Sequence, residues 1–78
     1  MTIVETIVEV SVLKMKTRLK TMIEKDGRSQ VFIAGKIGIS ETALSSLANG
    51  KSLPTLPVAY KIAKYFDVRI EDIWYPDK

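Results

Sequence analysis

Apolar residues recur at intervals of three and four along the chain from Lys14 onward, which is the spacing of one buried helix face. The first helix is predicted to begin at Lys14 and to end at Gly27, which suits a left-handed C-terminal cap. Two further apolar patterns begin after Ser29 and Ser40, and a serine hydroxyl can cap the free N–H groups of a helix start. The residues predicted to face inward in these three helices are Met15, Leu19, Met22, Ile23, Ile33, Ala34, Ile37, Leu44, Leu47 and Ala48.

The second and third predicted helices are joined by a very short turn that contains Gly38 and Ile39. Gly38 can adopt the positive φ that such a turn requires, and Ile39 can plug the space where the helices cross. Helices joined this tightly cannot lie antiparallel, so they cross steeply and leave one face of the helix over 40–49 uncovered. In a small basic protein, an uncovered and rigidly held helix is the usual means of entering the DNA major groove.

Two more helices are predicted towards the C-terminus. Thr55 caps the fourth helix, and Pro57 lies in its first turn, where the missing N–H costs nothing. A last short helix runs from about Ile70 to Trp74 and ends before Pro76. The pattern therefore predicts five helices, and the inward residues of the fourth are Ala59, Ile62, Ala63 and Phe66.

The first residues differ from the rest, because β-branched side chains dominate residues 2–13. Such side chains lose freedom in a helix and suit a pleated strand, although a helix that aligns Ile3, Ile7 and Val10, or a disordered segment, remains an alternative. A lone strand cannot satisfy its own backbone, so we expect residues 2–12 to pair antiparallel with the same segment of a second chain. The chain then divides into a dimerisation arm over 1–13, with Ile3, Val4, Val8 and Val10 at the interface, a helical domain over 14–75 and a tail over 76–78.

Composition narrows the possible chemistry. The 78 residues include no cysteine and no histidine, so the chain lacks thiolates, the commonest metal ligand and the commonest general base. A chain this short also has little room for a deep pocket, so we expect no enzyme and no metal or cofactor. The net charge of +3 and the pI of about 9.3 suit a nucleic-acid partner. No apolar run approaches the ~18 residues of a membrane span and no secretory signal is visible, so we expect a cytoplasmic, nucleoid-associated protein with no membrane partner.

Several positions matched in order through the helices carry a family resemblance: Ser29-Gln30, Ala34, Gly38-Ile39-Ser40, Leu44, Leu47 and Asn49-Gly50-Lys51. With these residues the chain resembles the phage-repressor or Cro-like helix-turn-helix family, also called the XRE class, over most of its length. The resemblance implies an all-α, five-helix lambda-repressor-like fold. It also implies a transcriptional regulator of repressor type that binds a palindromic operator on double-stranded DNA as a homodimer, with the third helix in the major groove.

The same resemblance implies roles for individual residues. Exposed positions of the third helix would touch base edges, whereas positions around the start of the second helix and after the third would contact phosphates. Glu41 has two interpretations, because an acid in the first turn stabilises its own helix and can also accept a hydrogen bond from cytosine. Hydroxyl groups discriminate bases poorly, so we expect a modest sequence preference that DNA shape or a second protein assists. The implied base-reading residues are Glu41, Thr42, Ser45 and Ser46, and the implied phosphate-binding residues are Gln30, Ser29, Asn49, Lys51 and Lys36.

The chain departs from the family pattern in two places. Many family members pair an arginine with a glutamate where this chain has Ile23 and Ala48, and a core tolerates the loss of both charges together. Val31 and Phe32 occupy positions that are usually polar, which suggests a surface for a partner. These residues and the weak recognition face keep an alternative open, namely a protein-interaction module of the same fold, antirepressor or antitoxin-like, with weak or no DNA binding. If the chain is a repressor, a protein antagonist is one means of controlling it.

Overall fold

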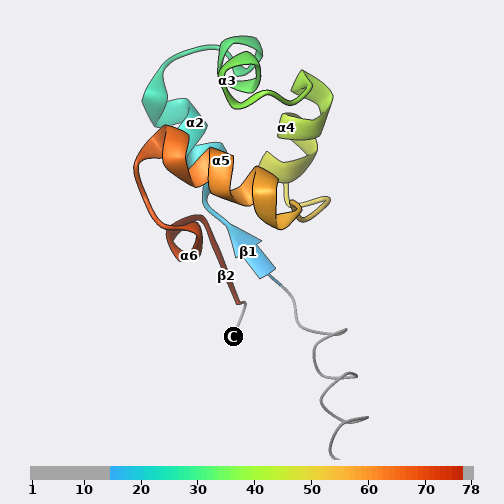
Figure 1. Ribbon diagram of the computed structural model, residues 1–78, viewed down its shortest axis with the longest axis vertical. Coiled ribbons are helices and arrows are strands. Elements are labelled where there is room, and N and C mark those ends of the chain that lie inside the picture. Colours follow the sequence, from blue (N-terminus) through green and yellow to red (C-terminus); the bar gives the residue numbers. More distant parts are fainter. Residues whose placement is uncertain (1–14, 77–78) are drawn as a thin grey trace, which may run out of the picture.

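The computed structural model describes residues 15–76, which form five helices and a two-stranded antiparallel sheet (Figure 1). The mostly helical, five-helix architecture expected from the sequence is confirmed. The predicted arm over 1–13, with Ile3, Val4, Val8 and Val10, lies outside the described residues, so its strand structure and its pairing stay predictions. The elements are β1 (Met15–Thr17), α2 (Leu19–Asp26), α3 (Gln30–Ile37), α4 (Glu41–Ala48), α5 (Leu56–Phe66), α6 (Ile70–Ile73) and β2 (Trp74–Pro76).

The starts of the two central helices follow the capping signals of the sequence. The Ser29 hydroxyl accepts a hydrogen bond from the Phe32 N–H at 3.1 Å, and the Ser40 hydroxyl accepts one from the Ala43 N–H at 3.0 Å. Each bond satisfies an N–H group that has no partner inside its own helix. Thr55 also stands at the N-cap of α5 in extended backbone, but its side chain makes no capping bond. The predicted helix starts are confirmed for α3, α4 and α5.

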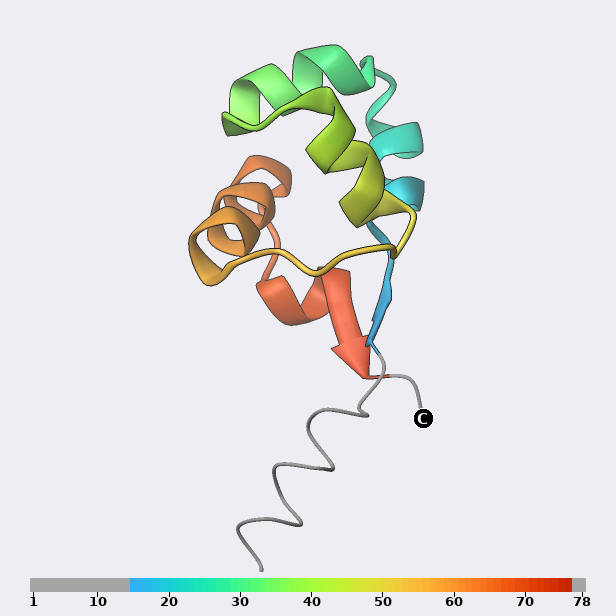
Figure 2. The same ribbon diagram turned by 90° about the vertical axis from the view of Figure 1, so that its right-hand side faces the viewer.

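The turn between α3 and α4 fixes the orientation of α4. The chain direction changes by 104° between the two helices, within the range typical of a helix-turn-helix. Gly38 takes the left-handed conformation with φ of 93°, and the N–H groups of Gly38 and Ile39 both donate to the Ala34 carbonyl, at 2.8 and 3.0 Å. Figure 2 faces α4 (olive), with α3 (green) above it. Among residues 15–76 no single helix is long and apolar enough to span a membrane, although the bent pair of α3 and α4 meets that test by combined length and composition.

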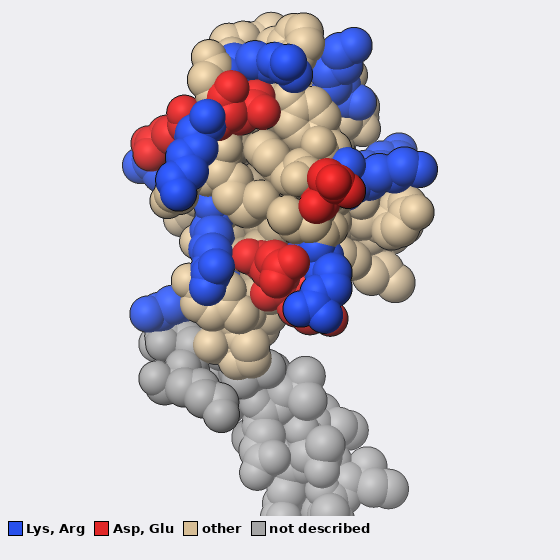
Figure 3. Space-filling model, turned by 90° about the vertical axis from the view of Figure 1, so that its left-hand side faces the viewer, with Lys and Arg blue, Asp and Glu red and all other residues tan. Residues whose placement is uncertain are grey.

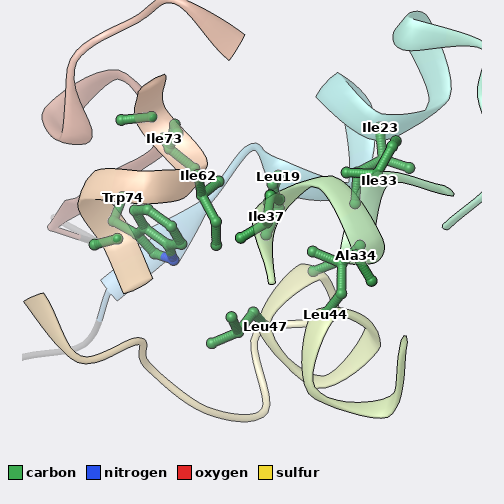
Figure 4. Packing of buried hydrophobic residues seen from close by; sticks show 13 residues of the cluster. Leu19, Ile23, Ile33, Ala34, Ile37, Leu44, Leu47, Ile62, Ile73 and Trp74 are labelled. Atoms are coloured by element: carbon green, nitrogen blue, oxygen red, sulfur yellow. The ribbon is translucent and has the colours of Figure 1, made fainter. Parts of the chain in front are cut away.

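One apolar core holds the helices together (Figure 4). Every helix contributes a large, fully buried side chain to this core, so detaching any helix would expose apolar surface to water. Ile23 and Ala48, which stand where many family members have an ion pair, are also buried in this core. The five largest fully buried side chains are Leu19, Ile33, Leu44, Ile62 and Ile73.

Two element boundaries predicted from the sequence are wrong, and a strand pair explains both. The first helix begins at Leu19 instead of Lys14, because Met15–Thr17 forms β1 and pairs antiparallel with Trp74–Pro76. The last helix therefore ends at Ile73, one residue before the predicted end. The Arg18 N–H donates to the Ile73 carbonyl at 2.9 Å, which ties the start of α2 to the end of α6. This sheet joins the two ends of the described chain and closes the core on that side (Figure 1).

Candidate nucleic-acid interface

Helix α4 presents two faces of opposite character. Leu44, Leu47 and Ala48 point into the core and are buried, as predicted. Glu41 and Thr42 on the other face are exposed, and Ser45 and Ser46 are half-buried. Apart from Glu41 in its first turn, the face carries short side chains, so another molecule can approach the helix backbone closely.

A shallow groove of about 500 Å³ lies along this exposed face of α4. All four residues predicted to read bases line it, together with three of the five residues predicted to bind phosphates. A second groove of about 440 Å³ lies beside it, and Thr42 and Ser46 line both. These two side chains therefore form a ridge between the grooves. The residues that line the first groove are Gln30, Glu41, Thr42, Ser45, Ser46, Asn49 and Lys51.

Two predicted phosphate-binding residues, Ser29 and Lys36, are not among the residues that line the first groove. Ser29 is exposed at the start of α3, where its hydroxyl caps the Phe32 N–H. The Lys36 ammonium lies 5.5 Å from the centroid of the Phe32 ring, on the outer side of α3. The structure thus brings Gln30, but not Lys36, together with the exposed face of α4.

Hydrogen bonds within the protein already engage several polar groups of the groove. The Ser46 and Ser52 hydroxyls lie 2.9 Å apart. The Asn49 side-chain amide donates to the Ser45 carbonyl at 2.9 Å and to the Ser45 hydroxyl at 3.3 Å. These bonds hold the side chains in fixed positions and reduce the number of donors free for a ligand. Ser52 is not predicted from the sequence, because a serine in a loop carries no signal of which hydroxyl it will contact.

The C-terminal end of α4 holds Lys51 at the end of the groove. Gly50 takes the left-handed conformation with φ of 72°. Its N–H donates to the Leu47 carbonyl at 3.2 Å, and the Lys51 N–H donates to the Ser46 carbonyl at 3.0 Å. This pair of bonds is the Schellman arrangement, which terminates a helix and fixes the path of the next residues. The backbone of Lys51 is therefore fixed, while its side chain is exposed.

The distribution of charge differs between the two sides of the molecule. Lys51 is the one cation and Glu41 the one anion among the residues that line the groove. Figure 3 shows the side away from α4, where Lys and Arg are interspersed with Asp and Glu. An exposed ion pair joins Arg69 Nε and Asp72 Oδ2 at 3.8 Å, and pairs of this kind contribute little to stability. Within residues 15–76 no group of three or more potential metal ligands comes together.

Comparison with known proteins identifies the family. The helix-turn-helix family model matches residues 19–73, which extend from the start of α2 to the end of α6. The chain belongs to the helix-turn-helix family. An uncharacterized HTH-type transcriptional regulator of Archaeoglobus fulgidus is 40% identical over 81% of this chain and 90% of its own length. One from Methanocaldococcus jannaschii is also 40% identical, over 77% of this chain and 91% of its own.

Two further helix-turn-helix proteins extend the comparison. The cryptic phage CTXphi transcriptional repressor RstR of Vibrio cholerae is 30% identical over 85% of this chain and 62% of its own length. The crystal structure of a proposed DNA-binding protein from Bacteroides fragilis covers 78% of this chain and 98% of its own, with a TM-score of 0.69 and 26% identity. These relatives confirm the XRE-type resemblance and make the chain a member of a family of DNA-binding transcriptional regulators, not of enzymes.

Proposed function

We propose that this helix-turn-helix protein is a transcriptional repressor that binds a palindromic operator as a homodimer and inserts α4 into the major groove. The observation that carries the proposal is the groove along α4, which collects Gln30 from α3 with Glu41, Thr42, Ser45, Ser46, Asn49 and Lys51. A major groove about 12 Å wide accepts one helix, and the short side chains of α4 allow it to enter deeply. A protein with this function works on the chromosome, in the cytoplasm.

The residues divide by the contacts that their chemistry allows. Thr42 and Ser46 form the ridge of the exposed face, and their hydroxyls can donate to or accept from base edges. Gln30 and Lys51 stand at the margins of the groove, and we assign them to phosphates. Since Ser46 and Asn49 already bond within the protein, we expect direct base readout to be sparse. DNA shape would then supply part of the sequence preference.

An apolar surface around the connection between α4 and α5 supports a homodimer. Leu53 and Leu56 are 61% and 74% exposed, which is high for leucine. They border an apolar groove of about 270 Å³ whose lining includes Met15 and Trp74. A protruding leucine beside an apolar groove is the self-complementary arrangement that a two-fold interface needs. Met15 lies two residues after the end of the predicted arm, so residues 1–13 would join the same interface, through Ile3, Val4, Val8 and Val10.

A selection of bound sequences from a random DNA pool tests the proposal. We expect a palindromic consensus with modest information at each base pair. Thr42→Ala should change the preferred bases, whereas Lys51→Ala should weaken all sequences alike and lower the slope of log affinity against log salt by about one. Lys64→Ala is the matched control, because it removes a positive charge that is also exposed but lies on α5. Recovery of random sequences, or equal effects of the two lysine variants, would refute the assignment of these contacts.

The dimer is tested separately by sedimentation equilibrium of the full chain. Leu56→Ser should shift the protein towards monomer without lowering its thermal stability as a monomer, because the side chain is mostly exposed in one chain. Val31→Ser is the control, since Val31 is 61% exposed but lies on the outer side of α3. A dimer that is equally stable in both variants would place the interface elsewhere.

A protein-interaction module of the same fold is the second candidate. It is favoured by the intramolecular bonds of Ser46 and Asn49, which limit base reading, and by the carboxylate of Glu41 on the exposed face. An electrophoretic shift assay at low salt separates the two functions. No shift with any duplex, including one bearing the selected consensus, would favour the interaction module.

A further inference from the structure

The outer side of α3 carries a second surface, whose residues do not line the groove along α4. Val31 is 61% exposed and Phe32 is 42% exposed, although both are large apolar side chains. Arg28 and Lys36 stand four residues before and after Phe32, and both are exposed. We call Arg28, Val31, Phe32 and Lys36 the Phe32 surface.

The phenyl ring is the centre of this surface. The Arg28 guanidinium carbon lies 5.2 Å from the ring centroid, and the Lys36 ammonium lies 5.5 Å from it. Both distances are within the range of cation–π attraction, which holds the two charges beside the ring. Within the described chain, neither cation has a carboxylate oxygen within 4.0 Å. The surface therefore combines apolar area with two positive charges that make no direct ion pair within residues 15–76.

Contacts with α2 and α5 position Arg28. Its Nη1 donates to the Tyr65 hydroxyl at 3.4 Å, and that hydroxyl donates to Asp26 Oδ2 at 3.2 Å. The Tyr65 ring meets the Phe66 ring edge to face, with centroids 4.9 Å apart. The hydrogen bond and charge interaction with Tyr65, and then the charge of Asp26, raise the pKa of Arg28, which like any arginine is protonated at neutral pH. Three elements thus build this side of the surface before any partner arrives.

The Phe32 surface points away from the DNA-facing groove. Gln30 lines that groove, and Phe32 follows it by two residues, which is a rotation of about 200° around the helix axis. A phosphate backbone could match the two cations but would leave the exposed apolar area of Val31 and Phe32 unmatched. A protein segment can match both. The position and composition of the surface therefore favour protein over nucleic acid as the ligand.

We propose that the Phe32 surface docks an acidic segment of a partner protein, in which carboxylates flank an aromatic or aliphatic side chain, while α4 stays on DNA. The apolar side chain would pack on Phe32 and Val31, and the carboxylates would pair with Arg28 and Lys36. Only the statement that α4 stays on DNA during docking rests on the proposed DNA-binding function, because the segment can bind the free protein as well. The partner would thus act on the repressor complex without competing for the operator.

A peptide-display selection on the full-length protein tests the proposal without a known partner. We expect the enriched peptides to carry an apolar residue between aspartates or glutamates. One such peptide, synthesised with a fluorophore, should bind Phe32→Ser and Lys36→Glu about tenfold or more weakly than the wild-type chain. Lys64→Glu is the control and should bind normally, because it reverses the charge of an exposed lysine of α5 outside the Phe32 surface. Lys36→Glu changes only an exposed charge, so it tests the idea even if Phe32→Ser folds poorly.

Three results would overturn the docking proposal. The first is enrichment of peptides with no acidic bias, and the second is unchanged binding to both surface variants. The third is loss of the dimer in Phe32→Ser by sedimentation, which would assign the surface to a second copy of this chain. Operator affinity separates this proposal from the proposed function. Phe32→Ser should bind DNA as the wild type does, and the peptide should not displace the duplex. If the wild-type chain binds no DNA, the repressor function is refuted but the docking proposal is not.

Discussion

The turn that sets the angle of α4 allows a sharp test with one pair of alanine substitutions. Gly38 lies in the turn with φ of 93°, and Gly35 lies inside α3. A Cβ atom added at either position meets nothing within 4 Å, so neither substitution causes a clash. The two variants therefore differ only in backbone conformation, and their effects on stability should have opposite signs.

The magnitudes follow from the two conformations. Alanine in the left-handed region costs about 1–2 kcal/mol, so Gly38→Ala should lower the free energy of unfolding by that amount. Alanine inside a helix is better than glycine by roughly 0.5–1 kcal/mol, so Gly35→Ala should raise it. For a domain of this size, 1 kcal/mol corresponds to a shift in Tm of about 4–8 °C. We therefore expect a difference in Tm between the variants of about 6–24 °C.

Thermal unfolding followed by circular dichroism, with urea unfolding as a second measurement, provides the assay. The folded variant can keep the native turn, with alanine strained in the left-handed conformation. The operator affinity of folded Gly38→Ala should therefore stay within about twofold of wild type, or about 0.4 kcal/mol. If Gly38→Ala is as stable as the wild type, the turn does not require a left-handed residue. The orientation of α4 derived from it would then be wrong.

Three further substitutions test the packing and the helix ends by the same unfolding assay. Leu44→Ala should cost about 2–5 kcal/mol, because Leu44 is fully buried beneath the exposed face of α4, and a loss below 1 kcal/mol would contradict that burial. Ser40→Ala should cost about 1 kcal/mol through loss of the bond to the Ala43 N–H, and no loss would mean that the cap is not formed. Asp67→Gly should stabilise by about 1 kcal/mol, because Asp67 has φ of 58° at the C-terminal end of α5, and destabilisation would refute this reasoning.

The sequence predicted most helices correctly because their start signals are local. Ser29 and Ser40 each cap the N–H three residues later, and this relation can be read from a few neighbouring residues. The first helix was placed too early because Met15 and Leu19 are spaced by four, which suits one helix face. The true partner of Met15 is Pro76 in β2. No periodic pattern can reveal a pairing between the two ends of the described chain.

The candidate site was predicted in part for the same reason. Positions on α4 follow from helix periodicity, and the groove includes all four residues assigned to base reading. The direction of Lys36 depends on the ring of Phe32, and that of Arg28 on Tyr65 from a distant helix. The first contact is local to α3, whereas the second is tertiary and leaves no signal in the neighbouring residues. The spacing of Arg28, Phe32 and Lys36 by four residues was the available signal for the second surface.

Methylation interference on a selected operator tests the central claim most directly, because guanine N7 lies in the major groove. If α4 enters that groove from each subunit of a dimer, methylation at N7 will block binding in two patches about 10 base pairs apart, on one face of the duplex. Methylation at adenine N3, in the minor groove, will have little effect between them. Binding that tolerates N7 methylation throughout the operator would show that the exposed face of α4 does not enter the major groove.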